Sequence, residues 1–451
     1  MKRVHNHEEN MYFDQLTTHK SSPEKESNLL QYAPIHTNGS ITLHHVPYSK
    51  SYLIRVLAMA MLAGAIDSVD NFRSPERSCR DINVMREALL TLCRTDSTTI
   101  PVEDAGTVWR FIVAIASLRT DRTINFSGRE RLFNRPIVPL IASLRALGAD
   151  ISFDPTDVRS MAIHTPATPL RAGHITSDTG ALSSQFLSAL MLIAPYLQGH
   201  TRIDLSHNQR SKPYTELTYK LMQEAGAKIL VSEEYVEIEK GSYNRRAVEQ
   251  LIQNAETDWT ALSYLHAWCA MPNGPKSIFV PDCFRESMQG DVALLKLISS
   301  FGVATRFFPH GILIERIKSA EKNKLVLDFV ANIDLVPTFV VLCLALARPF
   351  HFKRISALRL KESDRIEGLL NMAKNLGYAV EATDDDLFWE GQRIAMDRKA
   401  CIDPCGDHRL AMAASIFAFV EDGVQLQTPE VVEKSYPYFW EDARRIGLFL
   451  K

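Results

Sequence analysis

The fold of this chain is decided by residues 49–64, SKSYLIRVLAMAMLAG, which form a short polar start followed by a segment that is apolar on nearly every side. A helix that is apolar all round is buried, so this segment predicts a core helix. Five later segments have the same form: residues 105–118, 182–197, 258–271, 333–347 and 407–420. After the first interval their starts lie roughly 75 residues apart, which indicates a repeated supersecondary unit.

A second, amphipathic helix and short alternating strands follow the core helices. We expect such second helices at residues 135–147, 213–225, 289–301 and 361–376. Each of these four ends at a glycine, the residue that best tolerates a left-handed helix cap. Alternating patterns at residues 228–231 and 235–239, and again at 305–308 and 312–315, predict strand pairs. The unit is therefore predicted to be β-α-β-α-β-β.

Six such units in 451 residues predict two domains of three units, because one hydrophobic core does not extend over a chain of this length. The buried helices would lie inside each domain, with sheets and amphipathic helices around them. Residues 1–34 are polar and are expected to be a disordered extension, with ordered sequence beginning near Ile35. The last unit lacks closing strands, and residues 41–45 could supply one, so the chain would start and finish in the same domain.

Composition excludes several classes of function. A formal net charge of −2 leaves no basic excess for nucleic-acid binding. The seven cysteines have neither disulfide-like nor zinc-like spacing, which predicts free thiols in a reducing cytoplasm and no metal site. No uninterrupted apolar run reaches the ~20 residues that a membrane span requires. We therefore expect a cytoplasmic protein that binds neither nucleic acid nor membranes.

The core helices begin with polar groups that do not belong in a core. These starts are Ser49-Lys50-Ser51 with Arg55, Gly106-Thr107 with Arg110, Ser183-Ser184-Gln185, and Asp407-His408-Arg409. Helix N-termini carry free N–H groups and attract anions. One serine alone would be an ordinary N-cap, and one arginine alone a surface ion pair. Several together would bury unpaired cations unless an anion answers them, so the sequence predicts a polyanionic substrate.

A charged segment in the second half adds a candidate acid–base group. Lys361 and Arg365 lie four residues apart and share one helical face, whereas Glu362 is offset. The segment could be no more than a solvated helix start. A carboxylate among cations is nevertheless the arrangement needed for proton transfer beside a bound anion.

Taken in order, these motifs resemble the 5-enolpyruvylshikimate-3-phosphate synthase family along nearly the whole chain after the N-terminal extension. Besides the four helix starts, the resemblance extends to Arg135-Pro136-Ile137, Phe186, Ser211-Lys212-Pro213-Tyr214, Ser287-Met288-Gln289-Gly290-Asp291, Asp334, Lys361-Glu362-Ser363-Asp364-Arg365, Leu410-Ala411-Met412 and Lys434.

The resemblance implies a fold and a reaction. The fold is α/β (α+β), a two-domain inside-out α/β barrel with six β-α-β-α-β-β repeats, three per domain. A double crossover near Tyr48 and Glu256 would join domain I (residues 35–48 plus 257–451) to domain II (residues 49–256). The reaction is transfer of the enolpyruvyl (carboxyvinyl) group of phosphoenolpyruvate to the 5-hydroxyl of shikimate 3-phosphate, through a tetrahedral intermediate. It belongs to the shikimate pathway and uses no cofactor and no metal.

The resemblance also implies a role for each matching residue. Shikimate 3-phosphate would be bound by Lys50, Ser51, Arg55, Ser183, Ser184, Gln185, Ser211, Tyr214, Asp334 and Lys361. Phosphoenolpyruvate would be bound by Lys50, Gly106, Thr107, Arg135, Gln185, Arg365, Arg409 and Lys434. The catalytic groups would be Lys50, Asp334, Glu362 and Lys434, with Asp334 accepting the proton of the 5-hydroxyl. We also expect the protein to be a monomer. Glyphosate is expected to inhibit it, because Gly106 leaves room for this inhibitor.

Some positions depart from the family pattern. Tyr48 stands where glycine is usual, Asp104 where asparagine is usual, and Ala357 where asparagine is common, while Trp109 is bulkier than expected. Asp104 would weaken anion binding unless it pairs with a nearby arginine.

Two alternatives stay open. One is the related UDP-N-acetylglucosamine enolpyruvyl transferase, which usually has a cysteine where this chain has Glu130. The other is a catalytically inactive binding protein of the same fold.

Overall fold

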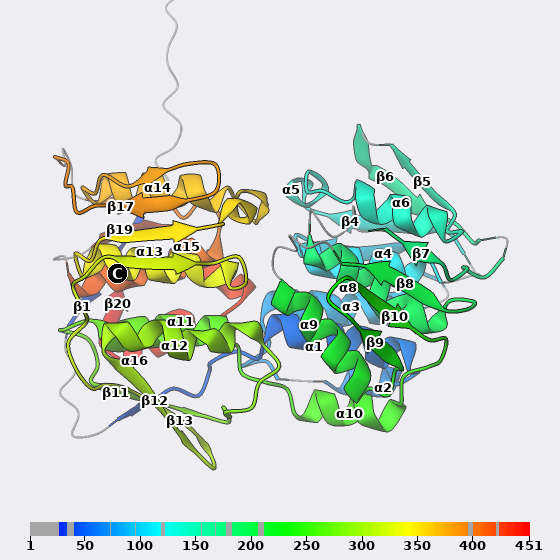
Figure 1. Ribbon diagram of the computed structural model, residues 1–451, viewed down its shortest axis with the longest axis horizontal. Helices are drawn as coiled ribbons and strands as arrows, with labels where there is room; N and C mark the ends of the chain where they lie inside the picture. Colours follow the sequence, from blue (N-terminus) through cyan, green and yellow to red (C-terminus); the bar gives the residue numbers. More distant parts are fainter. Residues whose placement is uncertain are drawn as a thin grey trace, which may run out of the picture.

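The computed structural model describes residues 27–33, 40–72, 74–94, 96–118, 122–154, 156–166, 168–176, 183–205, 212–395, 400–420 and 424–451. Two bodies lie side by side in Figure 1. One has a hydrophobic core of residues between 52 and 251, and we call it the first lobe. The core of the other combines residues 30–46 with residues 259–448, and we call it the second lobe.

The first lobe contains α1 to α10 and β3 to β10. Its helices are α1 (Lys50–Leu62), α2 (Ile66–Asn71), α3 (Arg80–Cys93), α4 (Gly106–Ala116), α5 (Glu130–Phe133), α6 (Val138–Ala146), α8 (Ser184–Ile193), η1 (Ala194–Tyr196), α9 (Lys212–Glu224) and α10 (Arg245–Gln253). Its strands are β3 (Thr99–Glu103), β4 (Ile124–Gly128), β5 (Ile151–Asp154), β6 (Asp157–Ile163), β7 (His174–Ile175), β8 (Thr201–Asp204), β9 (Ile229–Val231) and β10 (Tyr235–Ile238).

The second lobe contains the remaining elements. Its helices are α11 (Trp259–Ala270), η2 (Gly290–Ala293), α12 (Leu294–Ile298), η3 (Ser299–Phe301), η4 (Ile333–Leu335), α13 (Val336–Ala345), η5 (Ser356–Leu360), α14 (Arg365–Asn375), α15 (His408–Ala414), η6 (Ser415–Phe419), η7 (Pro429–Lys434) and α16 (Phe439–Arg445). Its strands are β1 (Ser27–Tyr32), β2 (Ile41–Thr42), β11 (Ser277–Pro281), β12 (Val303–Phe308), β13 (Gly311–Arg316), β14 (Leu325–Asp328), β15 (Phe350–Lys353), β16 (Glu381–Ala382), β17 (Leu387–Trp389), β18 (Cys401–Ile402), β19 (Val424–Gln427) and β20 (Leu448–Leu450).

The prediction of six buried core helices is confirmed. They are α1, α4 and α8 in the first lobe and α11, α13 and α15 in the second, and nearly all of their residues are buried. In the first lobe α1 packs against both α4 and α8, and in the second α13 packs against α11 and α15. The glycines expected to end the amphipathic helices, at positions 148, 226, 302 and 377, all have positive φ. The helices therefore lie inside and the sheets outside, as the expected α/β fold requires.

Five four-stranded sheets surround these helices in the described parts of the chain, and all five have the same pairing pattern. Their strand orders are β3-β4-β6-β5, β7-β8-β10-β9, β2-β11-β13-β12, β14-β15-β17-β16 and β18-β19-β1-β20. In each, the first pair is parallel and the next two pairs are antiparallel. This shared pattern is the structural form of the sequence repeat.

The structure corrects three expectations about the repeat. The first unit continues from α1 into α2 and α3, and the described residues hold no sixth sheet, because this unit is too short to add a hairpin. Residues 41–42 pair with β11 instead of closing the last unit. That unit is closed by β1, which pairs with β19 and β20, so residues 27–32 are a strand and not part of a disordered extension. Ile35, the expected start of order, lies outside the described residues.

The chain passes between the lobes at two adjacent points. Tyr48 forms an antiparallel bridge with Thr257. The Ser49 amide donates to the Glu256 carbonyl at 2.7 Å, and the Asp258 amide donates to the Pro47 carbonyl at 2.9 Å. Because the two crossings are hydrogen-bonded to each other, α1 and α11 begin side by side at the boundary between the lobes.

Candidate active site between the two lobes

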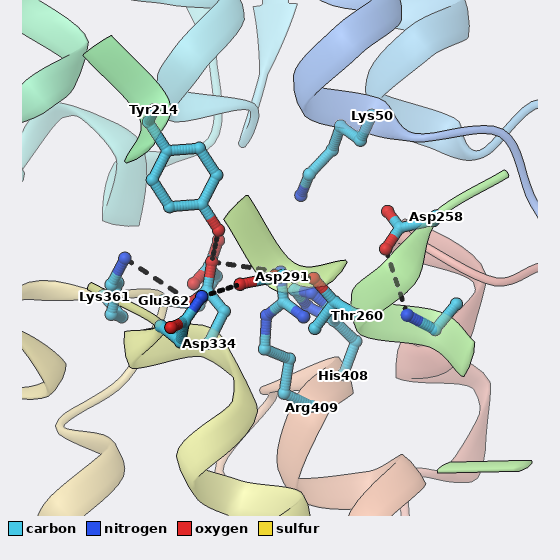
Figure 2. Close-up of polar contacts among 12 residues, drawn as sticks. Lys50, Tyr214, Asp258, Thr260, Asp291, Asp334, Lys361, Glu362, His408 and Arg409 are labelled. Atoms are coloured by element: carbon cyan, nitrogen blue, oxygen red, sulfur yellow. Dashed lines mark hydrogen bonds and ion pairs between the residues drawn. The ribbon is translucent and has the colours of Figure 1, made fainter. Parts of the chain in front are cut away.

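A cavity between the lobes gathers most of the residues that the sequence singled out. From the first lobe it is lined by Lys50, Ser51, Arg55, Thr107, Arg110, Arg135, Pro136, Ser183, Ser184, Gln185, Phe186 and Tyr214. From the second lobe it is lined by Asp334, Ala357, Leu360, Lys361, Glu362, Arg365 and Arg409. Figure 2 shows Lys50 and Tyr214 projecting from the first lobe toward Asp334, Lys361 and Arg409 of the second. Cations that are scattered along the sequence thus meet in one cleft.

The helix starts are positioned by local capping. The Ser49 hydroxyl accepts from the Tyr52 amide and starts α1, and the Ser183 hydroxyl accepts from the Gln185 amide and starts α8. The Asp407 carboxylate accepts from the Arg409 amide and starts α15. Each cap fixes where its helix begins, and residues of each first turn, such as Lys50, Ser184 and Arg409, line the cavity.

The first lobe contributes three guanidinium groups to the cleft: those of Arg55 and Arg110, which are buried, and that of Arg135, which is half-buried. Arg55 is 2% exposed and donates to the hydroxyls of Thr218 and Ser188 and to backbone carbonyls. Burial lowers the pKa of Arg55 to about 10. In the described part of the chain, no carboxylate forms an ion pair with any of the three arginines. Burying cations without partners is costly, so this half of the cleft is prepared for an anion.

Arg110 and Arg135 lie together at the start of α4. Arg110 donates to the Gln185 side-chain oxygen at 2.5 Å and to the Pro136 carbonyl at 2.7 Å. Burial and then the neighbouring Arg135 lower the pKa of Arg110 to about 9. A Cβ atom on Gly106 would lie 2.5 Å from the nearest Arg135 nitrogen and 2.9 Å from the nearest Arg110 nitrogen. The absence of a side chain at Gly106 is therefore what allows the two cations to sit beside this helix start.

The second lobe arranges its charges around Arg365, which is 1% exposed. Its guanidinium donates to Asp407 at 2.7 Å, to Asp334 at 2.8 Å and to Glu362 at 2.7 Å. These three carboxylates therefore share one buried cation that holds them in fixed positions. In contrast to the arginines of the first lobe, Arg365 is therefore paired with acidic side chains of its own lobe.

Asp334 is the central carboxylate of the cleft. Its oxygens accept from Arg365, from Arg409 at 3.2 Å, and across the cleft from the Tyr214 hydroxyl at 2.7 Å. Lys361 lies 3.5 Å away. Burial by itself would raise the pKa of Asp334, but Arg409, Lys361 and Arg365 together hold that pKa well below its usual range. Asp334 is thus an ionised carboxylate that faces both lobes.

A second charged group combines Lys50, Asp81, Glu362 and His408. The Lys50 ammonium donates to Asp81 at 2.9 Å. Burial would lower the pKa of Lys50, yet Asp81 and Glu362 raise it above its usual value, so Lys50 remains protonated. Burial and then Lys50 hold the pKa of His408 well below normal, so its imidazole is neutral. Glu362 has a pKa well below normal, because Arg365 and Arg135 outweigh the effect of its burial.

Two expected site residues that the structure describes, Gly106 and Lys434, are not in the cavity wall. Gly106 lies behind Arg135 and Arg110, as described above. Lys434 is turned aside, since its ammonium donates to the Asp104 carbonyl at 2.9 Å and lies 3.1 Å from the Asp104 carboxylate. Ser211 falls outside the described residues.

The departures from the family pattern have structural partners. Asp104 pairs with Arg131 as well as with Lys434. Trp109 is fully buried in the core of the first lobe, edge-on to Phe133, and does not narrow the cleft. Ala357 lines the cavity directly.

Sequence reasoning assigned no role to Asp81 and no ligand to Arg110. Asp81 is buried in the first turn of α3 and reaches Lys50 from another helix. Its sequence context is that of an ordinary amphipathic helix start, so no local pattern could have identified it. Arg110 was visible as an arginine one turn into a core helix, and its fixed contact with Gln185 became evident only in three dimensions.

Within the described residues, no group of three or more His, Cys, Asp or Glu side chains is placed to bind a metal ion. In the same part of the chain, no helix is long and apolar enough to cross a membrane. All seven cysteines are free thiols.

The fold and the site define a two-lobed α/β protein of the enzyme type, whose cleft places cations of one lobe opposite ionised carboxylates of the other. A family model described as EPSP synthase (3-phosphoshikimate 1-carboxyvinyltransferase) matches residues 81–443. A 3-phosphoshikimate 1-carboxyvinyltransferase of Bacteroides fragilis is 33% identical over 424 residues, which are 93% of this chain and 98% of the relative. A protein of the same name from Methanoculleus marisnigri is 29% identical over 78% of this chain and 80% of its own length.

A solved structure of EPSP synthase from Acinetobacter baumannii has the same fold, with a TM-score of 0.69 at 16% identity over 94% of this chain and 99% of that chain. The chain belongs to the EPSP synthase family. The resemblance in the motifs is thereby confirmed, and the chain is a transferase of the shikimate pathway. The family match does not favour the alternative acceptor UDP-N-acetylglucosamine.

Asp81→Asn tests how Lys50 is kept charged. The substitution removes the strongest influence that raises the pKa of Lys50, and burial then lowers that pKa. Lys50 would lose its proton earlier as the pH rises, so the alkaline limb of the activity profile should move to lower pH by about 1–3 units. The measurement is kcat/KM against pH in a phosphate-release assay.

Asp67→Asn removes the same charge from a side chain that is 83% exposed, and it is the matched control. An alkaline limb that stays in place in Asp81→Asn would show that Asp81 does not govern the protonation of Lys50.

Proposed function

We propose that this chain transfers the enolpyruvyl (carboxyvinyl) group of phosphoenolpyruvate to the 5-hydroxyl of shikimate 3-phosphate and releases inorganic phosphate. The observation that carries this proposal is the asymmetry of the cleft. Three arginines of the first lobe, Arg55, Arg110 and Arg135, form no ion pair with a described carboxylate, and they face a second lobe rich in ionised carboxylates. Two small phosphorylated acids would supply the missing negative charge, and the opposing carboxylates would handle protons.

Binding of the acceptor is assigned to the first lobe. The phosphate of shikimate 3-phosphate would lie against Ser183 and Ser184 at the start of α8, with Ser211 and Lys50 close by. Helix N–H groups and hydroxyls are suitable donors for phosphate oxygens. The carboxylate and ring would contact Ser51, Arg55, Gln185 and Tyr214, with Lys361 and Asp334 approaching from the second lobe.

Binding of the donor is assigned to the boundary between the lobes. Arg135, Lys50, Thr107 and Gln185 would hold phosphoenolpyruvate from one side, beside Gly106. Arg365, Arg409 and Lys434 would hold it from the other. Cations from both lobes on one small dianion favour the closed arrangement and exclude water from the reacting atoms.

The chemistry proceeds by addition and elimination. The 5-hydroxyl oxygen attacks C2 of the donor while Asp334 accepts the hydroxyl proton, and C3 takes up a proton from the group formed by Glu362 and Lys50 or Lys434. In the tetrahedral intermediate that results, the bond from C2 to the phosphate oxygen then breaks. C3 returns a proton, the enol ether forms, and phosphate leaves. The added negative charge of bound substrates would raise the pKa of Asp334 and make this carboxylate a better base.

Further expectations follow from the same proposal. The protein acts as a monomer in the cytoplasm, in line with its seven free thiols. Glyphosate, a small anion, would bind at the donor position beside Gly106.

The direct test is phosphate release from phosphoenolpyruvate with each of two acceptors. We expect turnover with shikimate 3-phosphate and none with UDP-N-acetylglucosamine. Turnover only with the sugar nucleotide would reverse the acceptor assignment. No turnover with either acceptor, in protein that still binds shikimate 3-phosphate by calorimetry, would instead identify an inactive binding protein.

Asp334→Asn tests the assigned base. The amide has nearly the same shape but cannot accept the proton, so we expect kcat to fall by about 10²–10⁴ while KM for shikimate 3-phosphate changes far less. Glu390→Gln, in a side chain 47% exposed, is the control. A variant with unaltered kcat and weakened binding would assign Asp334 to substrate binding alone.

Gly106→Ala tests the donor site. Its new methyl group would displace the guanidinium ends of Arg135 and Arg110, so we expect KM for phosphoenolpyruvate to rise about tenfold or more, and glyphosate inhibition to weaken in parallel. The control is Gly173→Ala, because a Cβ atom there would meet no atom within 4 Å. Unchanged donor KM and unchanged inhibition would place the donor away from Gly106.

A further inference from the structure

Asp104 is a buried carboxylate at the junction of the lobes. It lies between β3 and α4, two residues before Gly106, and is 3% exposed. Its carboxylate pairs with Arg131 from α5 of the first lobe and with Lys434 from η7 of the second. Lys434 also donates to the Asp104 carbonyl at 2.9 Å. The backbone carbonyl and the side-chain carboxylate of Asp104 therefore both hold the Lys434 ammonium group.

Lys434 differs in this respect from the cations around it. Arg135, Arg365 and Arg409, which share the donor assignment, all line the cavity, whereas Lys434 does not. Lys434 is only 6% exposed, so it has no access to bulk water that could replace its contacts with Asp104. The positive charge of Lys434 is therefore paired with Asp104 and does not point into the cleft.

We propose that Asp104 is a positioning residue that acts as an internal stand-in anion: it holds Lys434 at the junction of the lobes and releases it to phosphoenolpyruvate when the donor binds. This inference rests on the proposed role of Lys434 as a donor ligand. It adds a competition between Asp104 and the donor for one ammonium group.

Arg131 makes the exchange electrostatically feasible. When Lys434 turns to the donor, Asp104 keeps its pair with Arg131 and is not left as a lone buried charge, which would be strongly unfavourable. The Arg131 side chain is 45% exposed, so water also screens this remaining pair. Lys434 and Arg131 outweigh burial and hold the pKa of Asp104 well below its usual value, so both partners face an ionised carboxylate.

The exchange has a cost for donor affinity. Each donor molecule must break the contact between Asp104 and Lys434 before it gains its own contact with Lys434. In return, Lys434 is already held by Asp104, just before the start of α4, before the donor arrives. Asp104 thus sets donor affinity through Lys434 without touching the substrate.

The first measurement compares steady-state constants of Asp104→Asn with those of the unaltered protein. The amide keeps the shape and the backbone carbonyl but removes the charge that competes for Lys434. We expect KM for phosphoenolpyruvate to fall roughly three- to tenfold, the range for one ion pair, with little change in kcat or in KM for shikimate 3-phosphate. A rise in donor KM would mean that Asp104 only holds the lobes together, and it would overturn the proposal.

Arg131→Gln provides a second variant, at a partner whose side chain is 45% exposed. It leaves Asp104 charged with Lys434 as its remaining partner, so we expect donor KM to rise where Asp104→Asn lowers it. Glu130→Gln is the matched control, because this neighbour in α5 has a side chain 76% exposed and pairs with the surface residue Arg159. Equal changes in Arg131→Gln and Glu130→Gln would show a nonspecific charge effect and would also overturn the proposal.

Lys434→Gln separates this inference from the proposed function. We expect Lys434→Gln to raise donor KM, and Asp104→Asn to have no further effect in the Lys434→Gln background. A gain of donor affinity from Asp104→Asn that persists without Lys434 refutes the exchange and leaves the donor assignment intact. A donor KM that is unaltered in Lys434→Gln removes Lys434 from the donor site, and the exchange fails with it.

Discussion

The balance of buried charge between the lobes governs the site. Arg365 is almost fully enclosed, and three carboxylates, Asp334, Glu362 and Asp407, share its guanidinium. Without that cation the carboxylates would repel one another, and without them the cation could not be buried. The opposite wall contains arginines that form no ion pair with any described carboxylate. The wall from the second lobe thus has its charges paired internally, while the wall from the first lobe requires an anion. This difference makes the cleft a binding site for phosphorylated acids.

The architecture places these two walls opposite each other. Each lobe encloses three buried helices, and the paired crossings at Tyr48 and Thr257 bring the starts of α1 and α11 together at the boundary. Contacts join the two lobes directly, from Tyr214 to Asp334 and from Lys434 to Asp104. The lobes therefore meet through the same groups that would bind and transform the substrates. Substrate binding would exchange protein partners for ligand partners and would not create a site from separate surfaces.

Prediction from sequence succeeded where the signal is local. Core helices were visible because a buried helix is apolar on all sides, and helix ends were visible because glycine at position 302 or 377 adopts the left-handed conformation. It failed for β1 and β2, whose partners are set by pairing between distant segments. Residues 27–32 look like the polar extension before them, yet they complete the sheet of the last unit, hundreds of residues away. Short strands contain too few side chains to specify such pairing.

The sequence alone determined the chemical inventory: which helices are buried, which of them begin with hydroxyls and cations, and which family these motifs match. Only the tertiary structure decided how the charges are paired. It joins Lys50 to Asp81 and turns Lys434 toward Asp104, although 330 positions separate the last two. The reason is physical: the energy of an ion pair depends on distance and burial, and neither quantity is defined until the chain has folded.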